Sequence, residues 1–424
     1  MLEKFNGHRV LLLQGPLGPF FQRLAQELRS HGAEVIRMHF CGGDAWFGGG
    51  GDRSIAYRGP LYNWPDRLKK IIREEKIDDI FLLGDLRPYH RVVPDAIKGF
   101  STKLYVFEEG YLRPDYITLE PDGVNGNSRM SRYPDFYLKQ QWPPLPEPLT
   151  VGATFGISAR YTITYYCATF LAGLRYRHYV HHRDTGPLWH GFRWVRGLFR
   201  KYYYQFKEKK LLPTLTDKWS KRFFLFPLQV HNDYQFYHAD FPDIETCINE
   251  VISSFAKHAR RNQLLVIKHH PADRPYRDYS ALIERLAIAA DLRDRILYVH
   301  DLHLPTLLKH ARGTVVMNST TGLQSIHHGT PVMVLGRAIY NIEGLTARGT
   351  LDQFWRHPPE VNTALYRAFR CWLVHNNQFN GNFYRRIKGL PNPTGVLWDA
   401  APLTTEAPAP AVSPTPSSPP LPSS

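Results

Sequence analysis

Several features of membrane-spanning and secreted proteins are absent from this 424-residue chain. It contains no run of about 18 uninterrupted apolar residues, which argues against a transmembrane helix. Its first residues, MLEKFNGHRVLLLQG, lack the apolar stretch and small-residue cleavage site of a secretory signal. The four cysteines are scattered without a CxxC pair, so neither a disulfide framework nor a structural zinc site is indicated. We therefore expect a cytoplasmic protein.

Acidic residues are also scarce, with 38 Asp and Glu against 53 Lys and Arg, for a net charge of +15. This excess implies an anionic partner: nucleic acid, an acidic lipid surface or a phosphorylated ligand. No nucleic-acid-binding module is recognisable, so we expect no nucleic acid. Much of the excess lies between 160 and 210, where basic residues are mixed with Trp, Phe and Tyr. That composition is typical of a helix in a lipid headgroup layer.

The candidate membrane-contacting residues of this segment are three arginines, Arg193, Arg196 and Arg200. If they face an anionic membrane, replacing them with glutamate is expected to release the protein while sparing its fold. Each charge contributes about 1 kcal/mol near such a surface.

Two common ligand signatures are missing. The loop QGPLGP at 14–19 lacks the terminal Gly-Lys-Ser/Thr of a phosphate loop and does not match a dinucleotide fingerprint. Gln14, Gly15 and Gly18 remain candidates for a close approach to substrate. The paired histidines have no convergent ligand spacing, so we expect no metal.

Strand patterns alternate with helix patterns along most of the chain, which predicts an α/β fold with doubly wound parallel sheets. We expect an N-terminal Rossmann-like lobe over 1–150, a basic and aromatic helical insertion over 151–215, and a second Rossmann-like lobe over 216–400. Two such lobes facing a cleft describe the GT-B architecture of nucleotide-sugar transferases. Residues 401–424 are rich in Pro and Ser and cannot bury enough apolar surface to order themselves.

The first lobe carries carboxylates at predicted strand ends. Glu108, Glu109 and Gly110 follow the apolar run LYVF, and the glycine is expected to permit a sharp turn. Adjacent carboxylates diverge, so one is expected to be catalytic and the other structural, with the choice left open. Arg113 lies on the same loop, and Asp85 ends another strand of this lobe.

The second lobe carries two signatures suited to an anion. His270 and Pro271 follow LLVIK, where the proline restricts the histidine to extended geometry, and Lys268 adds positive potential. The other signature is Ser319, Thr320 and Thr321, expected at a helix start whose amides suit a phosphate or carboxylate. Gln324 stands where many two-lobed transferases have an acidic residue that binds the ribose of the nucleotide. Alone, these motifs also suit an ordinary loop, turn or cap; together they predict one cleft at the strand ends.

The combination of LLLQGPLGPFF, GDLRPYHR, VFEEGYLRPDYITLE, KHHPAD and NSTTG resembles the capsule polysaccharide β-Kdo transferases of Gram-negative bacteria, of the KpsS or LipB type. The similarity covers about residues 8 to 360. Related sialyltransferases share an acidic-acidic-glycine motif, an HP motif and a serine-rich motif.

The resemblance implies an enzyme on the inner face of the inner membrane that moves Kdo from CMP-β-Kdo to phosphatidylglycerol with retention and without metal or other cofactor. Glu109 or Glu108 would be the acid/base, and Asp85 or the remaining glutamate the nucleophile. The donor would be held by the second-lobe residues named above. It also implies a partner Kdo transferase and a capsule export complex.

Two alternatives stay open. One is another two-lobed transferase, such as a sialyltransferase or a glycerophosphate polymerase, which donor screening would distinguish. The other is a non-catalytic adaptor of capsule export. That role predicts that replacing both Glu108 and Glu109 with glutamine leaves capsule assembly intact.

Overall fold

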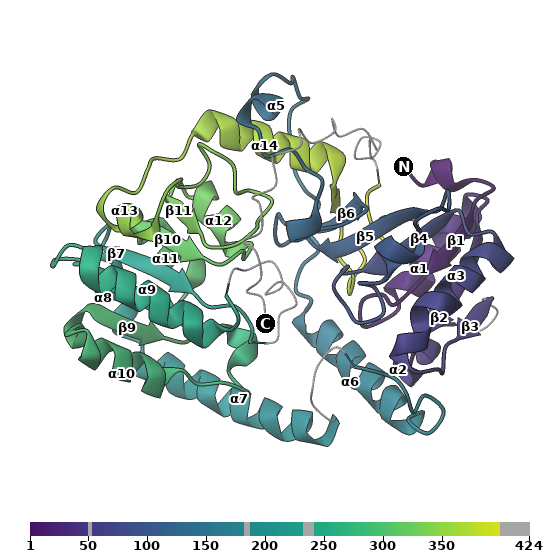
Figure 1. Ribbon diagram of the computed structural model, residues 1–424, viewed down its shortest axis with the longest axis horizontal. Helices are drawn as coiled ribbons and strands as arrows, with labels where there is room; N and C mark the ends of the chain where they lie inside the picture. The colour runs from purple at the N-terminus through teal and green to yellow at the C-terminus, as the bar shows by residue number, and fades with distance from the viewer. Residues whose placement is uncertain (50–52, 182–186, 232–240, 399–424) are drawn as a thin grey trace, which may run out of the picture.

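The computed structural model describes residues 1–49, 53–181, 187–231 and 241–398. They form two α/β lobes, each built on its own sheet (Figure 1). The predicted two-lobed α/β fold of GT-B type is therefore confirmed. The predicted disordered tail at 401–424 lies outside the described residues.

The sheet of the N-terminal lobe has seven strands in the order β12-β6-β5-β4-β1-β2-β3. Their bounds are β1 Arg9–Leu12, β2 Glu34–His39, β3 Ser54–Ala56, β4 Asp79–Leu83, β5 Lys103–Glu109, β6 Tyr116–Pro121 and β12 Gln378–Asn380. The first five run parallel, whereas β6 and β12 pair antiparallel. Side chains alternate between the two faces of each strand, so the sheet needs cover on both sides.

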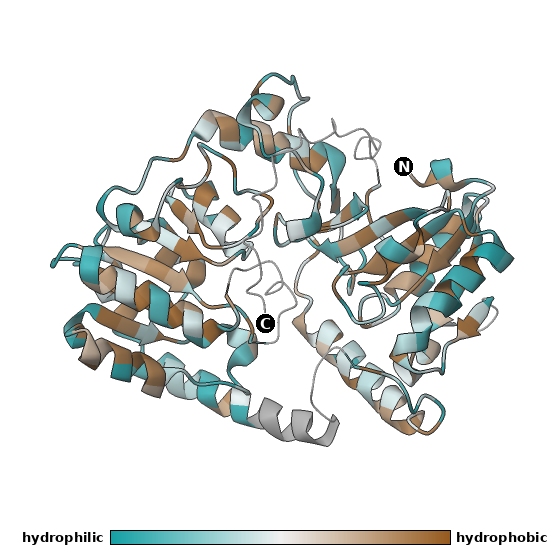
Figure 2. Ribbon diagram, in the orientation of Figure 1, coloured by the Kyte–Doolittle hydropathy of each residue, from teal (hydrophilic) through white to brown (hydrophobic). Residues whose placement is uncertain are grey.

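Helices supply that cover. Helix α1, Phe20–Ser30, packs its apolar side chains on one face of the sheet. Helices α3, Trp64–Glu75, and α4, Val93–Ala96, pack on the other. The short α2, Gly42–Trp46, follows β2. Figure 2 shows the apolar strands enclosed between helices with more hydrophilic outer surfaces.

The C-terminal lobe has a five-stranded parallel sheet in the order β11-β10-β7-β8-β9. The strands are β7 Phe223–Pro227, β8 Leu264–Lys268, β9 Ile296–Val299, β10 Gly313–Val316 and β11 Val332–Val334. The flanking helices are α9 Ile244–His258, α10 Ser280–Ala289, α11 Leu304–His310, α12 Thr321–His327 and α13 Leu351–Arg356. Helices α9, α10 and α13 share one core cluster with the sheet, and α11 shares another.

The chain returns to the first lobe near its end. Helix α14, Thr363–Asn376, packs in the C-terminal lobe and against α5, Pro134–Leu138. Strand β12 then pairs with β6, and Phe379, Phe383 and Trp398 enter the core beneath α1. We predicted 216–400 as one lobe; its last part belongs instead to the other sheet, because β6 offers an edge that β12 completes.

The basic and aromatic insertion is helical, as predicted. It contains α6 Phe155–Leu171, α7 Pro187–Lys207 and α8 Leu211–Thr216. Helix α6 packs on α2 of the N-terminal lobe, and α7 runs along the C-terminal lobe (Figure 1). Within the described part of the chain, no helix combines the length and apolarity needed to cross a bilayer.

Candidate functional site

The first group of predicted residues lies at one edge of the N-terminal sheet. Strands β5, β4 and β1 are parallel neighbours, so their carboxyl ends lie together. Glu108 and Glu109 end β5, Asp85 follows β4, and Gln14 follows β1. In open α/β sheets this edge is where ligands bind.

Two of these carboxylates are held by one short loop. Asn125 and Asn127, in the 3-10 turn Asn125–Asn127, donate to Glu108 Oε2 at 3.2 Å and to Asp85 Oδ2 at 3.0 Å. Glu108 Oε1 also accepts from the backbone N–H of Glu109 at 2.9 Å. Asp85 is only 5% exposed and accepts a further bond from the Val124 amide. The nearly full burial of Asp85 favours a positioning role over direct attack on a substrate.

Glu109 has different surroundings. It follows Phe107 by two residues and projects to the opposite face of β5 from Glu108. Burial raises the pKa of its carboxyl, and the positive charge of Arg113 partly opposes that rise. A raised pKa brings a carboxylate closer to the range in which it is an effective general base near neutral pH. Of the two glutamates, Glu109 therefore fits the acid/base role better.

Gly110 is required for a reason other than the one we expected. Its φ is not positive, but a Cβ there would lie 2.1 Å from the carbonyl oxygen of Tyr116. Glycine thus permits the close approach between the end of β5 and the start of β6.

The candidates in the first loop prove to be structural. Gln14 is 4% exposed, and its side-chain amide donates to Asp44, Tyr165 and Tyr179. Gly15 accepts a hydrogen bond from Arg87 through its carbonyl, and Gly18 lies against the ring of Tyr161. The loop is therefore occupied in holding α6, so the expected approach of Gln14 to substrate is corrected.

The C-terminal sheet brings a second group together. His270 follows β8, Asn318 and Ser319 follow β10, and Gln229 follows β7, which lies between those strands. Gln229 donates to the side-chain oxygen of Asn318 at 2.8 Å. The predicted HP and serine-rich motifs therefore share one edge.

The tautomer of His270 follows from its local geometry. Pro271 opens the 3-10 turn Pro271–Asp273, and the Ala272 amide donates to His270 Nδ1 at 3.1 Å. Because Nδ1 accepts, the proton of the neutral ring is on Nε2. Burial lowers the pKa of His270 to about 4; Asp273 opposes this, and the charges of Lys268 and Arg113 add to it. His270 is thus a neutral N–H donor at physiological pH.

Lys268 does not take the predicted donor-binding place. It is 5% exposed, and its Nζ donates to the carbonyl oxygen of His300 at 3.3 Å. Burial lowers the pKa of this lysine to about 8. Lys268 therefore acts on the site through its charge, beneath the strand ends.

The serine-rich motif leads into α12 as predicted, with a different capping pattern. Thr320 is the N-cap but makes no side-chain cap bond. Ser319 Oγ instead accepts from the Thr321 amide at 3.2 Å and donates to Thr321 Oγ1 at 3.1 Å. Gln324 lies one turn further along α12 and is partly exposed. Tyr340 Oη donates to the Ser319 carbonyl, fixing the motif from behind.

Gly322 is expected to be intolerant of substitution because a Cβ there would lie 2.3 Å from Tyr340 Oη. Gly322→Ala should lower the free energy of unfolding by about 1–3 kcal/mol, measured by chemical denaturation. Adding Tyr340→Phe, which removes the nearest atom, should recover part of the loss. Gly156→Ala is the control, because no heavy atom lies within 4 Å of that Cβ. Equal stability of the Gly322 and Gly156 variants would contradict the prediction.

Arg113 relates the two groups. Its charge acts on the pKa of both Glu109 in the first lobe and His270 in the second. Tyr111 and the partly buried Leu112, which precede Arg113, belong to one hydrophobic cluster with Leu323 of α12 and Tyr340. The acidic loop is thus packed against the lobe that carries the serine-rich and HP motifs.

Two residues were missed by sequence reasoning. His231, at the end of the β7 segment, pairs its Nδ1 with Asp273 Oδ1 at 2.5 Å, which joins that loop to the turn after His270. Its position after the central strand was the available signal. Glu120 of β6 is buried, which raises its pKa to about 7, while a hydrogen bond from Ser128 opposes the rise. The sequence pattern of β6 gave no indication that this carboxyl would be buried.

Three histidines with lowered pKa values should make the free energy of unfolding decrease as the pH is lowered. Burial lowers the pKa of His90 and His269 to about 3 and that of His270 to about 4. The unfolded chain therefore binds more protons below pH about 6.5. The free energy of unfolding is therefore highest above pH about 6.5. It falls as the pH drops toward the pKa values of these histidines in the folded protein, by up to about 1.4 kcal/mol per histidine per pH unit.

Denaturation midpoints between pH 6.5 and 5 test this. His269→Asn should give a shallower slope, whereas the exposed control His357→Asn should keep the wild-type slope. A flat wild-type profile over that interval would contradict the assignment.

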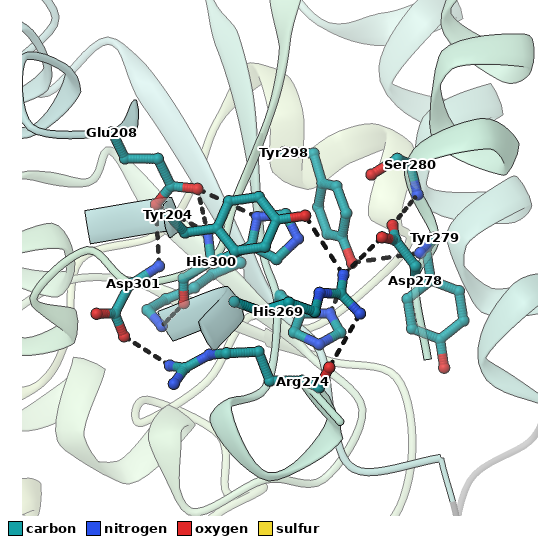
Figure 3. Close-up of polar contacts among 12 residues, drawn as sticks. Tyr204, Glu208, His269, Arg274, Asp278, Tyr279, Ser280, Tyr298, His300 and Asp301 are labelled. Carbon is teal, nitrogen blue, oxygen red and sulfur yellow. Dashed lines mark hydrogen bonds and ion pairs between the residues drawn. The ribbon is translucent and has the colours of Figure 1, made fainter. Parts of the chain in front are cut away.

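The predicted membrane arginines differ from one another. Arg196 is exposed, and the side chain of Arg193 lies outside the described residues. Arg200 is only 13% exposed and pairs with Asp278 at 2.5 Å, while donating to the carbonyl oxygen of Arg274 at 2.9 Å. Figure 3 shows this contact region between α7 and the C-terminal lobe. Arg200 therefore holds α7 in place, and its predicted lipid-facing role is corrected.

Other concave and polar features do not coincide with this site. A pocket beside the start of β11 is lined by residues 343–348, His357 and Glu360, and by none of the predicted site residues. Among the described residues, no three His, Cys, Asp or Glu side chains gather as metal ligands do. The absence of a metal in the reaction stays a prediction.

The fold and these motifs define a class of protein. The chain belongs to the capsule polysaccharide biosynthesis protein family, whose model matches residues 78–384. The resemblance stated from the motifs is thereby confirmed.

Named relatives extend over most of the chain. It is 39% identical over 384 residues to the capsule polysaccharide export protein KpsS of Escherichia coli, covering 89% of this chain and 97% of that protein. It is 37% identical over 390 residues to the capsule polysaccharide modification protein LipB of Neisseria meningitidis serogroup B, covering 90% and 93%. Among solved structures, Thermosulfurimonas dismutans KpsC, β-Kdo 2,7 transferase, aligns at 12% identity and a TM-score of 0.41, covering 87% of this chain and 92% of that chain.

Proposed function

We propose that the chain is a retaining glycosyltransferase that moves Kdo from CMP-β-Kdo to a phosphatidylglycerol acceptor at the start of capsule linker synthesis. The observation that supports it most is geometric: the acidic loop packs against the other lobe, with Tyr111 and Leu112 in one hydrophobic cluster with Leu323 of α12. In two-lobed transferases, the donor and the acceptor react between such strand ends of the two lobes. The family membership supports the capsule setting.

The donor side suits a single phosphate and a sugar carboxylate. His270 offers a neutral N–H from Nε2, and Ser319 and Thr321 offer hydroxyl groups on a fixed turn. Arg113, whose charge acts on Glu109 and His270, adds a guanidinium on the acidic loop. Hydrogen-bond donors and positive charge fixed in advance stabilise a departing phosphate without reorganisation during the reaction.

The chemistry runs in two displacements. A carboxylate oxygen forms a bond to the anomeric carbon while the bond from that carbon to the CMP phosphate oxygen breaks, and CMP departs with the electron pair. The acceptor hydroxyl oxygen then attacks the same carbon and displaces the carboxylate, while Glu109 takes the hydroxyl proton. The nucleophile is Asp85 or Glu108: Asp85 is 5% exposed, whereas Glu108 leaves β5 on the face opposite to Glu109, and the Asn125–Asn127 turn holds both carboxylates.

The acceptor and partners belong to the same proposal. A lipid acceptor places the reaction at the inner face of the inner membrane, and the linker begun there would pass to a partner Kdo transferase and an export complex. The positive net charge supports an anionic acceptor and surface.

The test is incubation of the full chain with CMP-Kdo generated in situ and fluorescent phosphatidylglycerol, with the product's anomeric configuration read by NMR. A β-Kdo product supports the proposal. Turnover with CDP-glycerol or a CMP-sialic acid donor, and none with CMP-Kdo, would replace it with another two-lobed transferase.

A non-catalytic role has its own test in cells. Full capsule assembly by the Glu108→Gln and Glu109→Gln double variant would favour an export adaptor. Loss of capsule with normal protein abundance supports catalysis.

A further inference from the structure

Helix α6 exposes apolar side chains along one side. Ile163, Phe170, Leu171 and Leu174 are 61–98% exposed, and the last follows the end of the helix. Phe170 and Leu171 follow Ile163 by 7 and 8 residues, which places these three on one side of α6, and Leu174 lies in the turn that follows the helix. Exposed apolar groups gathered in this way mark an interaction surface.

Helix α7 shows the same feature more strongly. Among the side chains of α7 that the structure describes, from Arg196 onward, the exposed large apolar ones are Leu198, Phe199, Tyr202, Tyr203 and Phe206. Counted from Phe199, the next three follow at 3, 4 and 7 residues, which is one side of a helix. We call these side chains, together with those of α6, the helix-pair face.

The inward side of α7 is polar. Arg200, Tyr204 and Glu208 are spaced four apart and contact the C-terminal lobe. Figure 3 shows Tyr204 and Glu208 turned toward His300 and Asp301. The Tyr204 ring stacks on His300 with 3.5 Å between centroids, and buried Glu208 accepts from the amides of His300 and Asp301 at 2.8 and 2.9 Å. A surface helix normally buries its apolar side, so α7 has the reverse arrangement.

Helix α6 is docked in the same way. Tyr165 donates to Asp44 at 2.8 Å and is buried with Gln14, while Thr169 accepts from the Gly43 amide at 3.1 Å. Polar groups thus help to fix the inner side of the helix, where Tyr161 also packs on Phe47, while Ile163, Phe170 and Leu171 are left exposed.

The charge of the two helices has one sign. Over residues 155–181 and 196–210 the sequence contains one acidic residue, Glu208, which is buried. Exposed basic residues in the same stretches are Arg160, Arg175, Arg177, Arg196, Lys207, Lys209 and Lys210. An apolar face bordered by positive charge complements an anionic lipid surface, where side chains enter the headgroup layer and cations contact phosphates.

We propose that the helix-pair face is the contact surface of this protein with an anionic bilayer. Both helices lie along the same lower side of the molecule in Figure 1, and α6 contacts α7. One helix is fixed to each lobe, so a bilayer bound to both also limits how the lobes move relative to each other. The surface uses residues outside the proposed catalytic groups and depends on neither the donor nor the acceptor.

The test is flotation of the full chain with vesicles of equal parts phosphatidylcholine and phosphatidylglycerol, without nucleotide sugar. The variant carries Phe170→Ser, Leu174→Ser, Phe199→Ser, Tyr203→Ser and Phe206→Ser. Its partitioning should fall at least about tenfold, because binding scales with the apolar area inserted. The matched control, Tyr133→Ser with Leu138→Ser, removes exposed side chains near α5 and should bind as wild type.

Wild-type binding should also weaken with phosphatidylcholine alone and at high salt. Equal binding by the variant and wild type would overturn the proposal. So would a wild-type dimer that the variant converts to monomer while vesicle binding is unchanged, because the face would then join two copies. Turnover of CMP-Kdo is measured separately with detergent-dispersed acceptor, so failure of the membrane proposal and failure of the proposed function remain distinguishable.

Discussion

Replacing Glu109 with glutamine is expected to lower kcat by about 10²–10⁴-fold with little change in stability. The amide preserves the size of the side chain but cannot accept the acceptor proton. Burial already raises the pKa of this carboxyl, so its neutral replacement removes no stabilising charge from the fold. The measurement is steady-state turnover with CMP-Kdo and lipid acceptor, beside a thermal denaturation curve.

The matched control is Glu284→Gln on the exposed side of α10, which should keep wild-type turnover. A second readout separates chemistry from positioning: the wild-type rate should fall at acid pH as Glu109 becomes protonated, and the residual rate of Glu109→Gln should lack that limb. Undiminished turnover in a folded Glu109→Gln enzyme would remove this residue from the mechanism.

Replacing Glu208 with alanine should destabilise the docking of α7 by about 3 kcal/mol. The carboxylate accepts from the amides of His300 and Asp301 and pairs with His300 Nδ1 at 3.1 Å. Its loss leaves buried donors without an acceptor. Hydrogen exchange should show faster exchange of the α7 amides, and the denaturation midpoint should fall.

Two further variants test whether the loss of stability comes from the missing acceptor oxygens of Glu208. Glu208→Gln retains one acceptor oxygen and should lose less stability than alanine, whereas Lys209→Ala, at an exposed position, should lose almost none. Unchanged exchange in α7 after Glu208→Ala would show that other contacts hold the helix.

The strand-end motifs were predictable because their signal is local. The apolar runs before Glu108, His270 and Asn318 indicate buried parallel strands, and parallel strands place their carboxyl ends at one edge. The prediction of two lobes follows from the same alternation. The local sequence pattern was sufficient to predict a residue's position wherever that position depends only on the residue's own strand.

Long-range packing was not predictable from those patterns. The sequence shows Arg200 in a basic stretch, but only the fold brings Asp278 beside it. Lys268 next to an HP motif suggests phosphate binding, whereas the carbonyl oxygen of His300 on a neighbouring strand end takes its ammonium group. Gln14 is similar, since its partner Tyr165 is 151 positions away.

The return of the chain through β12 affects the order in which the protein completes its structure during synthesis. Strand β12 and the side chains of Phe379, Phe383 and Trp398 are among the last described parts of the chain, yet they complete the sheet and core built from the first 121 residues. Domains of a nascent chain generally fold as they emerge, the N-terminal one first. Here the early lobe stays unfinished, with an open strand edge and uncovered aromatic core, until the later lobe has left the ribosome.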